Sequence, residues 1–181
     1  MPKVLRRLPN AKLLIVGDGL STGDLKLLSK ELHIEDSVIF AGEQPWEQIG
    51  KFYRLGDVFV SASVTETQGL TIIEAMASDV PVVAKDDRNI EGLIQDNWNG
   101  RIFKSENELP DILIEILTHK ELSNRYIINA RKTMDEYSAE QFGEKIENLY
   151  YRVLERYSRL EKRDHNGPKK LKKVKAQKTG L

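Results

Sequence analysis

The stretch DVFVSASVTETQGLTIIEAM (57–76) decides the fold, because it joins an apolar strand, a polar loop and a helix. After Asp57, the side chains up to residue 63 are apolar or small, and the stretch 57–63 predicts a strand. From Leu70 to Met76, apolar residues recur at helical spacing and predict a helix that begins near Gly69 or Leu70. A strand that leads through a short loop into a helix is the repeating unit of α/β folds.

The same alternation extends along the chain on both sides of this stretch. We expect five strands, at 12–16, 37–42, 57–63, 81–84 and 101–103. We expect helices after Gly69 and at about 23–32, 45–55, 90–95, 107–119, 121–136 and 138–160. This spacing implies parallel strands joined by right-handed crossovers. The sequence therefore predicts an α/β fold with a doubly wound, Rossmann-like parallel sheet and extra C-terminal helices.

The composition limits the classes of function. With 40% hydrophobic and 31% charged residues, the 181-residue chain is typical of one soluble domain with a core. It has no cysteine, which excludes disulfides and thiolate metal sites and favours a reducing, cytoplasmic location. Its three histidines are far apart in the sequence, and no metal site is expected. No apolar run approaches the roughly 20 residues that span a bilayer.

The net charge of zero hides an uneven distribution of charge. Residues 165–181 contain six lysines and no acid, so residues 1–164 carry a net charge of about −6. We therefore expect a folded domain over residues 1–160 and a basic, disordered tail over 161–181. The lysines from Lys169 to Lys178 suit either an anionic membrane surface or a solubilising, nucleic-acid-binding role.

Two carboxylates flank the predicted start of the helix. Ligands of open parallel sheets bind where loops follow the carboxyl ends of strands, and Glu66 lies in such a loop. Glu74 follows about one turn into the helix, whose start offers free N–H groups to an anion such as a diphosphate. Gly69 would let a ligand approach the backbone. Carboxylates accept hydrogen bonds from sugar hydroxyls. The alternative is that Glu66 is a helix-start acid that favours the helix dipole and that Glu74 is an ordinary exposed helix residue.

Two further loops follow predicted strands. Gly17-Asp18-Gly19 is either part of a dinucleotide-binding fingerprint, without its third glycine and its later acid, or a tight turn. The segment KDDRNIEGL (85–93) either contacts a ligand or forms a polar loop.

Four segments together resemble the C-terminal, donor-binding half of the retaining glycosyltransferases of family 4, also called group 1. In the order and spacing of that family, they are LLIVGDG (13–19), VIFAG (38–42), DVFVSASVTETQGLTIIEAMASDVPVVA (57–84) and IEGLIQDNWNG (90–100). The resemblance covers about residues 8–157. Its most specific element is the pair Glu66 and Glu74, with Ser63 three residues before and Gly69 three after the first glutamate. It implies a GT-B fold, in which two Rossmann-like domains face each other across a cleft and need no metal.

The resemblance also implies roles for individual residues. Glu66 would contact hydroxyls of the transferred sugar, as a catalytic residue that binds and stabilises charge rather than forming a covalent bond. Glu74 would hold the ribose hydroxyls of the nucleotide. The other donor-binding residues would be Gly17, Gly19, Ser63, Gln68, Gly69, Leu70 and Thr71. Further candidates are Gly42, Lys85 and Glu91.

The implied reaction transfers a hexose from a nucleoside diphosphate donor, expected to be a UDP-sugar, to a lipid or glycan acceptor with retention of configuration. AKDDRN…LIQDNWNG (84–100) most resembles the bacterial branch that glucosylates diacylglycerol, which favours glucose and a position at the inner face of the membrane. The alternatives are a non-catalytic nucleotide-sugar-binding module and a sugar-nucleotide epimerase of the same fold, which depends on a histidine. No nucleic-acid partner is expected.

The family's diphosphate-binding arginine and lysine lie upstream of the first strand seen here. They belong to a glycine-rich turn that this chain lacks, and the N-terminal acceptor domain precedes that turn. The parent protein's N-terminal domain is therefore an expected partner. We expect this chain alone to bind nucleotide weakly and to catalyse little.

Overall fold

The computed structural model describes residues 1–64 and 68–166, and its strands and helices alternate as the sequence predicts. The chain divides into two units, Met1–Tyr137 and a second that begins at Ser138. The strands of the first unit are β1 (Leu13–Val16), β2 (Val38–Gly42), β3 (Phe59–Ser61), β4 (Val82–Lys85) and β5 (Arg101–Phe103). Its α-helices are α1 (Pro2–Arg7), α2 (Thr22–Glu31), α3 (Ile49–Leu55), α4 (Leu70–Ala77), α5 (Leu109–Thr118) and α6 (Lys120–Asp135). Its 3₁₀ helices are η1 (Glu35–Ser37), η2 (Trp46–Gln48) and η3 (Arg88–Ile90). The second unit contains α7 (Ala139–Asn166).

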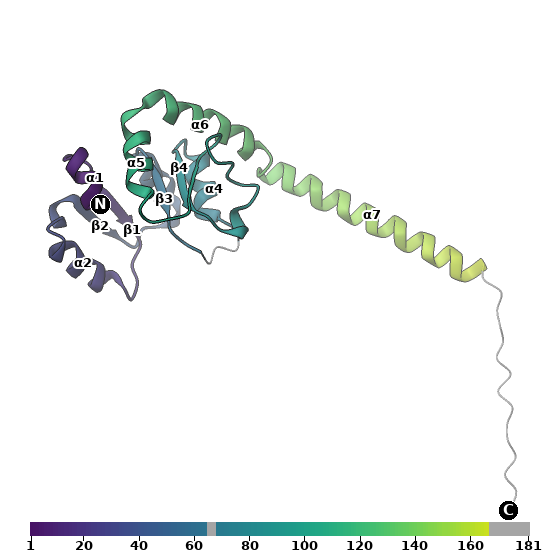
Figure 1. Ribbon diagram of the computed structural model, residues 1–181. Helices are drawn as coiled ribbons and strands as arrows, with labels where there is room; N and C mark the ends of the chain where they lie inside the picture. Colours follow the sequence, from purple (N-terminus) through teal and green to yellow (C-terminus); the bar gives the residue numbers. More distant parts are fainter. Residues whose placement is uncertain (65–67, 167–181) are drawn as a thin grey trace, which may run out of the picture. The chain divides into compact units, whose positions relative to one another are not determined.

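The strands form two parallel sheets (Figure 1). β1 pairs with β2, from Leu13 opposite Val38 to Val16 opposite Gly42, and the other sheet has the order β3-β4-β5. All three strand pairs are parallel, as expected for strands joined by helical crossovers. Within the described ranges, one edge of β1 and one edge of β3 have no strand neighbour. The α/β class is confirmed, with the five strands divided between two sheets.

β4 lies at the centre of the three-stranded sheet and is buried on both faces. Val82 and Ala84 point to one face and pack with Ile72 and Met76 of α4. Val83 points to the other face, where α5 and the middle of α6 complete a second core. Figure 1 shows α4 and α5 on opposite sides of this sheet. Burial on both faces explains why β4 is a continuous apolar run rather than an alternating pattern.

The helix predicted at 90–95 is wrong. The chain makes only the 3₁₀ turn η3 there, and Gly92 then adopts a φ of +85°, which ends a right-handed helical path. The buried Asn99 side chain binds main-chain groups of residues 93 and 95, just after Gly92. Its amide nitrogen donates to the carbonyl oxygen of Leu93 at 3.0 Å, and its oxygen accepts from the amide of Gln95 at 2.7 Å. These side-chain hydrogen bonds replace the ones a helix would make.

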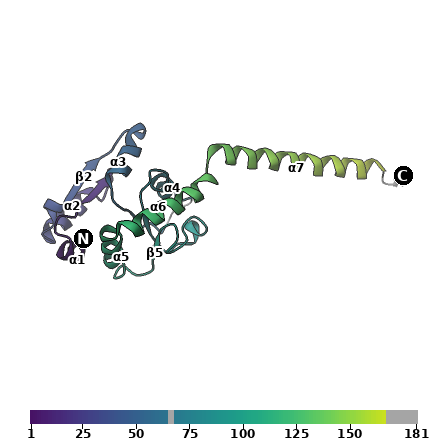
Figure 2. The ribbon, with the colours of Figure 1, turned by 90° about the horizontal axis from the view of Figure 1, so that it is seen from above.

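The second unit is an amphipathic helix, which Figure 2 shows as one continuous element. It runs to Asn166, past its predicted end at residue 160. Exposed apolar side chains recur on it every three or four residues, at Phe142, Ile146, Leu149, Tyr150, Val153 and Tyr157. The lysines from Lys169 to Lys178 lie outside the described residues.

Candidate functional site

Gly69 begins α4 in a left-handed conformation, with φ 62° and ψ 37°. A methyl group added to it would lie 3.1 Å from Cδ2 of Leu93 and 3.6 Å from Cγ2 of Ile90. An L side chain is disfavoured here both by the backbone conformation and by the lack of space. The predicted reason for this glycine was access for a ligand. The structure adds a second reason, which is close packing of the helix start against the segment that follows β4.

The first turn of α4 is open to solvent. The carbonyl oxygen of Gly69 accepts the amides of Ile72 and Ile73 at 2.9 and 3.0 Å. The amides of Leu70 and Thr71 therefore precede the first hydrogen bonds of the helix. Both residues are exposed, and no side chain in the described part of the chain caps this end. Free N–H groups and the positive end of the helix dipole suit an anionic ligand.

Glu74, one turn further along α4, is half-buried and accepts a hydrogen bond from Tyr53 of α3. The distance from the phenol oxygen to Oε2 of Glu74 is 2.8 Å. The Tyr53 ring packs edge-on against Phe59 of β3, with ring centroids 5.4 Å apart. Burial, and then the hydrogen bond and charge of Glu74, raise the pKa of Tyr53 above the ordinary value for a phenol. At neutral pH, Tyr53 is therefore a protonated donor that fixes one oxygen of the carboxylate.

The carboxyl ends of β1 and β2 meet at two glycines. The amide of Gly17 donates to the carbonyl oxygen of Gly42 at 2.7 Å, and their φ values are +120° and +68°. The next residues bind each other, because Oδ1 of Asp18 accepts the Thr22 hydroxyl and the Gly19 amide, each at 2.7 Å. These two hydrogen bonds lower the pKa of Asp18. The geometry fits the tight-turn interpretation of residues 17–19.

The loop after β4 contains the other sequence candidates. Lys85 ends the strand and is half-buried, and Glu91 is exposed beyond η3. Asp87 begins η3, and its Oδ1 accepts the amide of Asn89 at 2.7 Å. A hollow of about 270 Å³ runs along this loop, lined by Asp86, Asp87, Arg88, Ile90, Glu91, Gly92, Ile94 and Ile102. The hollow lies along this loop, and the carboxylate of Asp87 stabilises the loop's own turn.

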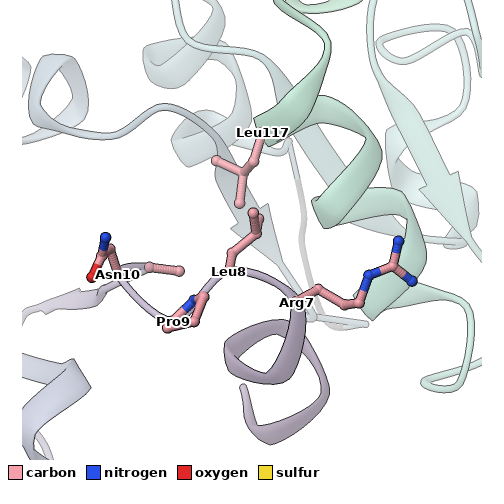
Figure 3. Close-up of a pocket in the computed structure, with 6 residues that line it drawn as sticks. Arg7, Leu8, Pro9, Asn10 and Leu117 are labelled. Carbon is pink, nitrogen blue, oxygen red and sulfur yellow. The ribbon is translucent and has the colours of Figure 1, made fainter.

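Another hollow, of about 280 Å³, lies beside the end of α1 (Figure 3). Leu8 and Leu117 face each other across it. It adjoins the chain just before β1 and the last turn of α5, so it lies toward the amino ends of the parallel strands. Ligands of such sheets bind at the opposite, carboxyl edge. We therefore do not assign this hollow to the candidate site.

The structure brings together part of the predicted donor site. Gly69, Leu70, Thr71 and Glu74 share the first turns of α4, and Gly17 contacts Gly42. Glu66 lies outside the described residues, so its position beside Glu74 stays a prediction. On either side of that gap, Ser63 is half-buried and Gln68 is exposed.

Sequence reasoning missed Tyr53. It lies inside a predicted helix, where a tyrosine is an ordinary amphipathic residue, with an apolar ring and a polar tip. Its hydroxyl meets Glu74 only because α3 packs against α4, and the two residues are 21 positions apart in the sequence. In the sequence, the only signal for this contact was a tyrosine near the end of a predicted helix that leads into a strand.

The described residues contain neither a cluster of metal-ligating side chains nor a helix suited to cross a membrane. In residues 1–64 and 68–166, no group of three or more histidine, aspartate or glutamate side chains is placed to hold a metal ion. None of the described helices combines the length and the apolar character needed to cross a bilayer.

Comparison with known proteins places the chain in a family. Its residues 1–133 match the family described as glycosyl transferases group 1. The alpha-monoglucosyldiacylglycerol synthase of Streptococcus pneumoniae is 35% identical over 147 residues, which cover 81% of this chain and 33% of that enzyme. The chain spans about a third of the length of the curated relatives it matches.

Solved structures show the same fold. A mutant of TarM from S. aureus, solved with fondaparinux, alpha-GlcNAc-glycerol and UDP, is 28% identical with a TM-score of 0.75, covering 82% of this chain and 31% of that chain. The C-terminal domain of LpcC, a glycosyl transferase group 1 family protein from Francisella tularensis, is 24% identical with a TM-score of 0.68, covering 76% and 77% of the two chains. The protein belongs to the group 1 glycosyltransferase family.

Proposed function

We propose that this chain is the donor-binding half of a retaining glycosyltransferase that uses a UDP-sugar. The observation that carries the proposal is the open first turn of α4 beside Glu74, whose carboxylate Tyr53 orients. Free amides suit a diphosphate, and an oriented carboxylate suits the paired hydroxyls of a ribose. UDP in the complex of the TarM mutant supports the uridine nucleotide. Likeness to the solved LpcC domain supports a C-terminal half of a GT-B fold.

The proposed sugar is glucose and the proposed acceptor is a lipid, which makes a diacylglycerol glucoside the expected class of product. Support comes from the pneumococcal relative, whose name specifies a monoglucosyl group and diacylglycerol. We propose that Glu66 contacts the transferred sugar and stabilises charge, and that Glu74 binds the ribose. No metal is required in this scheme, because the helix start and the parent enzyme's cations would neutralise the diphosphate.

The strand order supports a partner segment from the parent protein. The usual dinucleotide-binding sheet has the order 3-2-1-4-5-6. The observed β2-β1 and β3-β4-β5 arrangements reproduce this order if β1 is its second strand and the first strand is supplied from elsewhere. We propose that an upstream strand of the parent protein fits between β1 and β3. The turn after it would supply the diphosphate-binding arginine and lysine, and the acceptor domain would precede it.

We propose a peripheral position at the cytoplasmic face of the membrane. The six lysines between Lys169 and Lys178 support it, because each basic residue near an anionic surface contributes about 1 kcal/mol. Vesicle sedimentation of the whole chain tests this. We expect binding to vesicles that contain phosphatidylglycerol, and little binding to phosphatidylcholine vesicles. Equal binding to both would refute an electrostatic role of the tail.

Titration of the chain with UDP and UDP-glucose, followed by NMR, tests the donor site. Chemical-shift changes are expected at residues 17–19, 66–74 and 85–92. A Glu74→Ala variant should bind UDP more weakly, whereas Glu121→Ala, at an exposed glutamate of α6, should bind as the wild type does. Shift changes confined to the lysine tail would show that UDP binds there by charge alone and would refute the proposal.

The parent enzyme allows the two glutamates to be separated. Glu74→Ala should mainly raise KM for the donor, since a ribose contact is made equally in the ground and transition states. Glu66→Ala should mainly lower kcat, since charge at the sugar develops in the transition state. Equal changes of both constants in both variants would contradict this division of roles.

A further inference from the structure

The packing of the Tyr53 ring fixes the direction of its hydroxyl group. Its ring packs against the core that contains Ile72 and Met76, and Phe59 closes one edge at an interplanar angle of 65°. The hydroxyl emerges from this packing to reach Oε2 of Glu74 at 2.8 Å. A phenol has only two side-chain torsions, so packing of its ring fixes the position of its oxygen.

Glu74 has a long side chain with several rotatable bonds and is half-buried on α4. A glutamate loses much of its rotamer freedom when it is fixed in one conformation. The hydrogen bond from Tyr53 fixes Oε2 before any ligand arrives. A carboxylate accepts about four hydrogen bonds in all, so it keeps capacity for two neighbouring hydroxyls after Tyr53 takes one position.

Tyr53 stays a donor across the working pH range. Its pKa is raised by burial first, and then by the hydrogen bond and the charge of Glu74. Deprotonation would place two negative charges beside each other, which the partly buried surroundings oppose. Tyr53 and Glu74 therefore form a stable donor–acceptor pair.

We propose that Tyr53 is a positioning residue that holds the Glu74 carboxylate in the orientation needed to bind the vicinal hydroxyls of a nucleotide's ribose. This inference rests on the proposed function, in which Glu74 binds that ribose. In this scheme Tyr53 contacts Glu74 and not the nucleotide. Its contribution is to reduce the ordering that Glu74 undergoes when a nucleotide binds.

The first test compares two nucleotides on the whole chain. Tyr53→Phe keeps the ring and removes the hydroxyl. We expect the affinity for UDP to fall about 5- to 10-fold, because Glu74 then loses part of its side-chain freedom only when the nucleotide binds, while 2′,3′-dideoxy-UDP binds the variant and the wild type equally. Tyr126→Phe is the matched control, because Tyr126 is a buried tyrosine whose hydroxyl lies 3.5 Å from Asn97 rather than near Glu74. It should leave both affinities unchanged.

The comparison separates a positioning role from a structural one. An equal loss of affinity for both nucleotides in Tyr53→Phe would show that the tyrosine merely supports the fold, and this would overturn the inference. No loss for either would overturn it as well. In a Glu74→Ala background, Tyr53→Phe should cause no further loss, because the group it positions is gone.

A ligand-free measurement keeps this inference distinct from the proposed function. NMR relaxation of the Glu74 side-chain carbons should report an ordered side chain in the wild type and in Tyr126→Phe, and a mobile one in Tyr53→Phe. An equally ordered Glu74 in Tyr53→Phe overturns the positioning role whatever the nucleotide does. A second outcome is that the order of the Glu74 side chain depends on Tyr53 but the wild type binds UDP and dideoxy-UDP equally. That outcome refutes the ribose-binding role of Glu74, and with it the proposed reason for ordering this carboxylate.

Discussion

Replacement of Gly69 by alanine should destabilise the first unit through two separable effects. A left-handed backbone costs an L residue about 1–2 kcal/mol. The new methyl would also lie 3.1 Å from Cδ2 of Leu93, which is buried and has little room to move. Such overpacking costs about 1–3 kcal/mol. The smaller freedom of alanine in the unfolded chain offsets roughly 0.4–1 kcal/mol. The expected net loss in the free energy of unfolding is therefore about 1–4.5 kcal/mol, with a middle value of roughly 3 kcal/mol.

Urea unfolding followed by tryptophan fluorescence measures this loss. With a urea slope of about 1–3 kcal/mol per molar, the midpoint should fall by roughly 1 M or more. A Leu93→Val background removes the crowded Cδ2 atom, so Gly69→Ala should cost about 1 kcal/mol less there. Gly143→Ala is the control, since an added methyl would meet nothing within 4 Å on α7 and alanine favours a helix.

The two outcomes that would refute this reasoning differ. An unchanged midpoint for Gly69→Ala would refute both effects. Neither the left-handed backbone conformation of Gly69 nor the contact of the added methyl with Leu93 would then carry the expected cost. An equal cost in the Leu93→Val background would refute only the steric part. Loss of UDP binding by a well-folded Gly69→Ala chain would add that the helix start also serves the ligand.

Three further changes test the fold around the site. Asn99→Ala leaves buried main-chain groups without partners and should cost about 1–3 kcal/mol in urea unfolding, whereas the exposed Asn89→Ala should cost under about 0.5 kcal/mol. Arg131→Ala removes the ion pair with Asp79, whose pKa the Arg131 hydrogen bond lowers. The pair's contribution is thus present at neutral pH and lost as the pH falls below the usual aspartate pKa, so the urea midpoints of variant and wild type should differ slightly at pH 7 and converge near pH 2. In a spectrophotometric titration of the tyrosines, Tyr53 should ionise at higher pH than an ordinary phenol, and Tyr53→Phe should remove that late step.

Local sequence pattern was enough to predict where the strands and most helices lie along the chain. The continuous apolar run 81–84 predicts a strand buried on both faces, and β4 is that strand. The prediction failed at 90–95, where an apolar spacing compatible with a helix is overridden by Gly92 and by the side chain of Asn99. Whether Asn99 binds the main chain depends on where α6 and β5 place it, which no local window contains.

Part of the candidate site could likewise be predicted from the sequence, and part depends on packing. The spacing of Gly69 and Glu74 is a property of the sequence, since 3.6 residues per turn fix their relation on a helix. Spacing also suggested an open helix start for an anion. Ligand access at Gly69 stays a prediction, and the spacing could not show its second reason, because the residues that crowd it, Ile90 and Leu93, come from a segment more than 20 positions away.

The sequence by itself determined the α/β class, the helix start at Gly69 and the resemblance to a glycosyltransferase family, because these depend on short-range periodicity and on motif spacing. Tertiary structure alone decided that Tyr53 reaches Glu74, that Gly17 meets Gly42, and that the strands form two sheets. Each of these is a contact between segments brought together by packing. Local propensity carries no information about such contacts, since they depend on which faces of the elements the core buries.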